Sequence, residues 1–167
     1  KTMKKNKKKY ITRYHVIQSL FAGIFITFII LIGETFSNNV INAAIGSSVA
    51  LLFLHPKNRQ NNFKSLVMGN MVAIITFLIL YYLFLLFHQG LFLSISNKDF
   101  HVFSGLSFFI CLFVMSITNS EHIPAAGTSI GLSINPLDYR LIFFIIFSVF
   151  FLYLLKLALD KYGKNII

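Results

Sequence analysis

Long tracts without a charged side chain set the strongest limit on how this chain can fold. Six stretches contain no Asp, Glu, Lys or Arg: 14–33, 35–54, 65–97, 100–120, 122–137 and 141–155. The 167 residues include 20 Phe, and their mean hydropathy is +0.75. A soluble domain of this size cannot bury so much apolar surface, so the lipid bilayer must act as the solvent of the chain.

The lengths of the apolar runs predict an all-α transmembrane bundle. A spanning helix needs about 20 residues to cross roughly 30 Å of hydrocarbon. Four runs are long enough, at about 15–34, 64–87, 101–118 and 139–158. Two segments between them, 40–54 and 123–134, are shorter and richer in small residues, and they predict partial spans. The single bundle therefore covers 15–158, between a basic arm at 1–14 and a tail at 159–167.

The distribution of basic residues predicts that both termini are cytoplasmic, because Lys and Arg are retained on that side of membrane proteins. If all six segments cross, thirteen of the fifteen basic residues lie inside, and only Lys98 and Arg140 lie outside. If 123–134 instead dips in and returns, the inside count falls to ten. We prefer six crossings, although the sequence leaves both arrangements open. Orientation and contact with anionic lipid also account for the net charge of +10 without nucleic acid.

A small-residue motif occurs in both short segments. The first copy contains Ala43, Ala44, Gly46, Ser47 and Ser48, and the second contains Ala125, Ala126, Gly127, Thr128 and Ser129. Each copy is the middle element of a block of two long segments and one short one. The blocks are 15–87 and 101–158. Because each block has three crossings, an odd number, the pattern predicts two repeats of inverted topology.

Inverted repeats of this kind place short helices around a shared site near the membrane midplane. We expect the two short helices to meet tip to tip at a hydrated pocket, where hydroxyls and the exposed amides that follow Pro124 bind a small anion. The predicted substrate-binding residues are Ser47, Ser48, His122, Gly127, Thr128 and Ser129. Glu121 and His55 are candidates for gating or for a linked proton. The alternative is that both motifs only serve close helix packing.

The second motif resembles the signature of the HPP family of small integral membrane proteins. The signature reads here as His122-Ile123-Pro124-Ala125-Ala126-Gly127-Thr128-Ser129-Ile130-Gly131, with Ile123 in place of the middle proline. An earlier block from Ala44 through His55-Pro56 to Met68-Gly69-Asn70 is also similar, with Asn70 in place of a usual His. The resemblance covers most of 15–158. It implies a compact bundle and, for some members, nitrite transport.

Two function hypotheses follow from these observations. The first is a permease or channel for a small inorganic anion such as nitrite, and the second is a non-transporting membrane scaffold or sensor. We expect no cofactor and no metal, because the five histidines form no ligand pair at membrane depth. We expect no enzyme, because no catalytic motif occurs. The apolar surface of so small a bundle is compatible with a homo-oligomer.

Overall fold

The computed structural model describes residues 13–34, 39–91, 97–134 and 137–162, which form an all-helical protein. The six α-helices in these ranges are α1 (Arg13–Gly33), α2 (Asn39–Leu54), α3 (Gly69–Leu91), α4 (Asn97–Thr118), α5 (Ile123–Ser133) and α6 (Tyr139–Tyr162). A 3₁₀ turn, η2 (Arg59–Asn61), and a π-helical turn, η3 (Lys64–Met68), connect α2 with α3. The predicted helical bundle is confirmed. Residues 1–12 of the basic arm and 163–167 of the C-terminal tail lie outside the described residues.

Four helical segments are long and apolar enough to cross a membrane. They are Val16–Gly33, Lys64–Phe87, Phe100–Thr118 and Tyr139–Lys161. The short segments also form where they were predicted, as α2 with 16 residues and α5 with 11. At about 1.5 Å per residue, α5 is only about 16 Å long, roughly half the hydrocarbon thickness.

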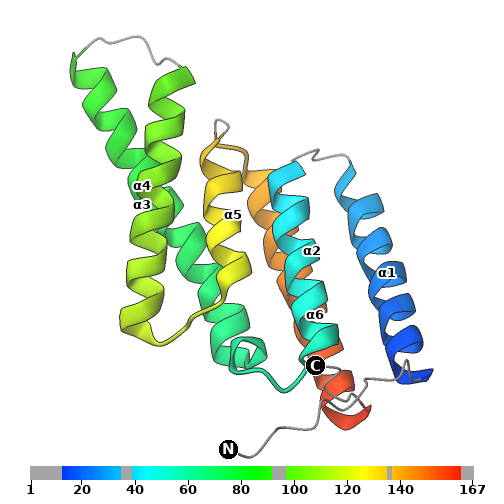
Figure 1. Cartoon of the computed structure of the whole chain (residues 1–167). Coiled ribbons are helices and arrows are strands. Elements are labelled where there is room, and N and C mark those ends of the chain that lie inside the picture. The colour runs from blue at the N-terminus through cyan, green and yellow to red at the C-terminus, as the bar shows by residue number, and fades with distance from the viewer. Residues whose placement is uncertain (1–12, 35–38, 92–96, 135–136, 163–167) are drawn as a thin grey trace, which may run out of the picture.

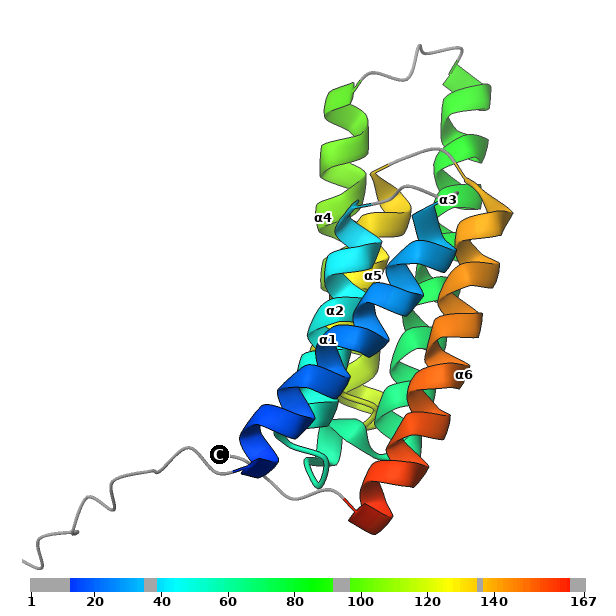
Figure 2. The ribbon, with the colours of Figure 1, turned by 90° about the vertical axis from the view of Figure 1, so that its right-hand side faces the viewer.

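The helices form two layers that run alternately up and down the bundle. One layer contains α1, α2, α5 and α4 in that order, and α6 and α3 lie behind it (Figures 1 and 2). The end at which α1 begins and α6 finishes, where η2 and η3 also lie, is called the basal end. It is at the bottom of Figure 1. Alternation alone does not relate the two blocks by a symmetry axis, so the inverted repeat stays a prediction.

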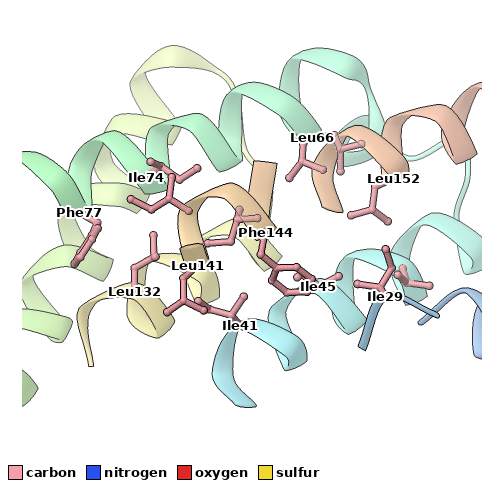
Figure 3. Packing of buried hydrophobic residues seen from close by; sticks show 14 of the residues in the cluster. Ile29, Ile41, Ile45, Leu66, Ile74, Phe77, Leu132, Leu141, Phe144 and Leu152 are labelled. Atoms are coloured by element: carbon pink, nitrogen blue, oxygen red, sulfur yellow. The ribbon is translucent and has the colours of Figure 1, made fainter. Parts of the chain in front are cut away.

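A hydrophobic core joins all six helices of the described residues. Figure 3 shows Ile41 and Ile45 of α2 packed with Phe144 of α6, and Leu132 of α5 near Leu141. The outward faces are also apolar. Phe21 on α1 is 58% exposed and Phe113 on α4 is 58% exposed. Because lipid chains are as apolar as these side chains, the helices associate through close packing and hydrogen bonds rather than through exclusion of water.

The short helices α2 and α5 lie side by side and antiparallel, so the expectation that they meet tip to tip is wrong. A Cβ at Gly131 would lie 2.6 Å from Cγ1 of Ile41, and a Cβ at Gly127 would lie 3.4 Å from Cβ of Ala44. Small residues on the facing sides let the two backbones approach along their length. The tight contact leaves no hydrated pocket between the tips of these helices.

Candidate functional site

The beginning of α5 lies at the basal end, where His122, Ala125 and Ala126 are fully buried. Pro124 occupies the first turn, where its missing N–H costs no helical hydrogen bond. His122 precedes the helix with extended backbone angles, φ −138° and ψ 94°. Because α5 contacts α2, α3 and α4, a residue at its start can touch several elements at once.

The ring of His122 connects the start of α5 with α2 and η2. Its Nδ1 lies 3.0 Å from the backbone oxygen of Gln60 in η2, and its Nε2 lies 3.0 Å from Oγ of Ser48 in α2. A carbonyl oxygen can only accept, so Nδ1 carries the hydrogen and Nε2 of the neutral ring accepts from Ser48. The side chain is fully buried. His122 therefore fixes the start of α5 against both α2 and η2.

The link from α4 to α5 is held by its own backbone. Asn119 has a positive φ of 56°, the N–H of Ser120 donates to Met115 at 3.0 Å, and the N–H of Asn119 donates to Ser116 at 3.3 Å. These are the bonds of a Schellman motif, which ends a helix and satisfies its last carbonyls. Arg59 of η2 donates to the side-chain oxygen of Asn119. The link and η2 thus support the position of His122 together.

Glycine at the start of α3 allows this link to approach. A Cβ at Gly69 would lie 2.8 Å from Cβ of His122 and 2.9 Å from the backbone oxygen of Ser120. Neither neighbour is the flexible end of a side chain. The neighbouring Asn70 is buried and donates to the carbonyl of Leu66 at 2.8 Å, so this amide serves the local helix.

Burial keeps the His122 ring neutral at physiological pH. Removal from water lowers the pKa of His122 to about 4, although the bond to the carbonyl of Gln60 acts in the opposite direction. In the neutral ring the single N–H is occupied by Gln60. The neutral ring therefore has no second N–H to donate to an anion.

Two neighbouring hollows border the start of α5. The α2–α4 hollow has a volume of about 580 Å³, and its mainly apolar lining includes Ser47, Gln60 and Gly127. The His122 hollow has a volume of about 360 Å³, and its lining includes Gln60, Ser116, Glu121 and His122. Gln60 and Ile123 line both. Together the hollows lead from the polar link to the exposed side of α2.

The structure separates the predicted substrate-binding residues into two groups. Ser47 and Gly127 line the α2–α4 hollow, His122 lines the other, and Ser48 contacts His122 from behind. Thr128 and Ser129 are buried and line neither hollow. The hydroxyl of Ser129 donates to the carbonyl of Ala126 at 2.8 Å, within its own helix.

The two residues proposed for gating lie at different places in the structure. Glu121 is exposed and lines the His122 hollow. His55 directly follows α2, and its carbonyl accepts from the backbone of Asn58 at 2.9 Å and from the side chain of Asn61 at 2.7 Å. His55 is outside the lining of both hollows.

The start of α5 does not offer the row of free amides that the sequence suggested, and this prediction is corrected. Pro124 has no N–H, and the N–H of Ala125 donates to the carbonyl of His122 at 2.9 Å. Ala125 and Ala126 are fully buried. Anion binding at this end must therefore use side chains as well as backbone.

Sequence reasoning missed Gln60 and Ser116. Gln60 contributes a backbone oxygen to His122 and lines both hollows, yet it lies in a polar run that is typical of a loop. Any residue at position 60 would supply a backbone carbonyl, so the sequence could not indicate this hydrogen bond. Among the described residues, no three His, Cys, Asp or Glu side chains gather closely enough to hold a metal ion.

A bundle with four long apolar helices, a short buried helix and a polar link at one end defines a multi-pass membrane protein. The sequence profile of the HPP transmembrane region matches residues 7–165, and the chain therefore belongs to the HPP family. Neither the curated proteins nor the solved structures gave a match to it.

Proposed function

We propose that the protein is a permease for a small monovalent inorganic anion such as nitrite, which enters through the His122 hollow. The observation that carries this proposal is a hollow, about 360 Å³ in volume, whose mainly apolar lining includes Gln60, Ser116 and Glu121 beside a buried and fully hydrogen-bonded histidine. Nitrite and ions of similar size fit such a volume. His122 bonds the start of α5 to α2 and η2, so an ion that binds beside it can change the contacts between these elements.

Electrostatics at the basal end favour an anion. Lys57, Arg59 and Lys64 belong to the segment that connects α2 with α3, and Lys161 lies near the end of α6. Clefts near charges of one sign concentrate ions of the opposite sign. Glu121 opposes this effect locally, since it is the acidic residue that lines the hollow. Gln60 and Ser116 offer an amide and a hydroxyl to an ion that has entered.

The proposed orientation places the basal end in the cytoplasm, as positive charge at that end favours. In this orientation the anion meets the His122 hollow from inside the cell. Two inverted blocks would give an equivalent approach from the other side.

Passage requires movement of α5 against α2. The contacts of Gly131 with Ile41 and of Gly127 with Ala44 close the seam between these helices. An anion in the hollow therefore has no open route along the seam. This supports a carrier that changes conformation over a channel that is permanently open.

Flux measurements in proteoliposomes test the proposal. Purified protein should take up nitrite faster than protein-free vesicles, and Arg59→Gln should reduce the rate at low nitrite by removing positive charge. Ser148→Ala is the matched control, because this buried serine donates only to Phe144 in its own helix α6, at 2.8 Å. Equal uptake by protein vesicles and empty vesicles of nitrite, nitrate and formate would contradict the proposal.

The second candidate is a non-transporting membrane scaffold or sensor, and the closed seam between α2 and α5 favours it. On this reading the small residues only allow close packing. The lining of the α2–α4 hollow, which includes Ala43 and Ser47, would then accept a helix of another protein. Absence of flux together with stable association of a second membrane protein would support this candidate.

A further inference from the structure

The hydroxyl of Ser48 stands between two acceptors. Its Oγ lies 3.0 Å from Nε2 of His122 and 3.2 Å from the carbonyl oxygen of Ala44. A serine has one hydrogen to donate. While His122 is neutral, Ser48 can serve either Nε2 or Ala44, but not both at full strength.

Addition of a proton to Nε2 resolves this competition. The new N–H of His122 donates to Oγ of Ser48, and the hydroxyl hydrogen of Ser48 turns to the carbonyl of Ala44. Nδ1 continues to donate to Gln60. Every group in the chain of bonds is then satisfied, and the only motion needed is rotation of one hydroxyl. The cluster is thus built to accept the charged ring as well as the neutral one.

The charged ring has no buried carboxylate beside it among the described residues. α2 and α5 contain no ionisable side chain, and the first in α3 is Tyr81, more than three turns from Gly69. In the neighbouring part of α4 the nearest is Cys111, which is neutral. The loops supply His55 and the cations Lys57, Arg59 and Lys64, against the exposed Glu121. Removal of the ring from water is why the pKa of His122 is low.

An anion in the His122 hollow would supply the missing charge. His122 is one of the residues that border that hollow and its side chain is fully buried, so the negative charge would lie close to the protonated histidine rather than on an exposed face of its ring. An opposite charge within a few ångströms favours the charged form. By thermodynamic linkage, a proton on His122 must then strengthen anion binding by the same factor.

We infer, on the basis of the proposed permease, that His122 is a proton-binding site and that each anion crosses together with one proton held on Nε2. The proton comes from water on the side where the anion enters, occupies the lone pair of Nε2, and is released to water on the other side. The pair carries no net charge, so transport is electroneutral.

Proton uptake into proteoliposomes tests the inference. Vesicles with a pH-sensitive dye inside receive a nitrite gradient while valinomycin and K⁺ clamp the membrane potential, and the signal of protein-free vesicles is subtracted to remove leakage of nitrous acid. We expect one proton for each nitrite and a rate that does not change with the clamped potential. Nitrite flux that moves charge without protons would overturn the inference and leave the proposed function intact.

Four variants assign the proton to a residue. His122→Gln keeps a hydrogen-bonding side chain but cannot take up a proton, so proton uptake should fall at least tenfold. Ser48→Ala should weaken proton uptake, and Ser148→Ala should leave it unchanged. If Glu121→Gln abolishes proton uptake while His122→Gln keeps it, Glu121 carries the proton and the inference is wrong.

A binding measurement on the native chain keeps the test independent of folding of the variants and of transport. In protein labelled with ¹⁵N-histidine in nanodiscs, saturating nitrite should raise the titration midpoint of His122 by about one unit or more. If vesicles show no flux of any tested anion, the proposed function fails. In that case, a rise in the titration midpoint of His122 would still support coupled binding of the proton and the anion. An unchanged midpoint would contradict both the coupled binding and the permease.

Discussion

The helices α2 and α5 carry related motifs but occupy different environments. In both, a serine donates to the carbonyl three residues earlier, Ser47 to Ala44 and Ser129 to Ala126, each at 2.8 Å. Ser129 is nevertheless fully buried among α2, α3 and α4, whereas Ser47 is exposed beside the α2–α4 hollow. The motif thus determines local hydrogen bonding, and the neighbouring helices determine what each copy can do.

The strongest test of the buried environment of α5 is the loss of His122. His122→Ala should lower the free energy of unfolding by roughly 3 kcal/mol, because it leaves a cavity and removes the donor for the carbonyl of Gln60. His55→Ala, at the end of α2, should cost well under 1 kcal/mol. Thermal unfolding in detergent measures both. Equal effects would show that the two histidines are equally peripheral.

Glycines provide the next comparison. Gly131→Ala places a Cβ 2.6 Å from Ile41 and should destabilise the protein by about 2 kcal/mol through overpacking. Gly46→Ala in α2 places its Cβ 3.7 Å from Ile26, which is ordinary contact, and should be neutral or slightly stabilising. Midpoints of unfolding from fluorescence-detected size exclusion compare the two. If Gly131→Ala leaves the unfolding midpoint unchanged, the packing between α2 and α5 is loose enough to accept an added methyl group.

Acid should weaken the start of α5 selectively. His122 has a folded pKa of about 4, below the ordinary value of 6.5, so the unfolded chain binds more protons between these values. Stability is therefore complete above about pH 6.5 and declines as the pH falls toward 4. From pH 7.5 to 5.5 the contribution of this residue should fall by roughly 1 kcal/mol. His122→Gln should remove this part of the pH dependence, and an unchanged profile would show that another group causes it.

Adjacent serines give the smallest expected effect. Ser48→Ala removes the partner of Nε2 and should cost about 0.5–1 kcal/mol. Ser47→Ala removes only a bond within its own helix at an exposed position and should change stability by a few tenths of a kcal/mol. Unfolding of the two variants in parallel measures the difference. If both variants lose the same free energy of unfolding, the bond between Ser48 and His122 does not add stability beyond that of a bond within the helix.

Helix positions were largely predictable because length and charge control which segments can cross lipid. The expected segment 40–54 is observed as Asn39–Leu54, and 123–134 as Ile123–Ser133. The predicted end at 87 was placed too early, and the predicted start at 101 was placed too late. α3 continues to Leu91, and α4 begins at Asn97 and includes Lys98 and Asp99. Polar residues at the end of a long helix can extend beyond the hydrocarbon without ending the helix.

The arrangement of the helices and the site were less predictable. The motif predicted that Gly127 and Ala44 matter together, but it could not distinguish tips that meet from sides that touch. That choice depends on which side chains face each other, as with Gly131 and Ile41. The chain of bonds through His122 depends on a backbone oxygen of Gln60, which any residue at that position would supply.

The unequal reach of the helices has a consequence for the surrounding lipid. α3 and α4 extend past the other helices at the end opposite the basal end (Figure 1), and apolar residues there are well exposed, including Phe87 at 69% and Val102 at 74%. Exposed rings at that height require hydrocarbon around them, while the neighbouring α5 is only about half as long as a full span. The bilayer must therefore thicken or the bundle must tilt on this flank. A change in membrane thickness would therefore shift α4 relative to α5 along the membrane normal.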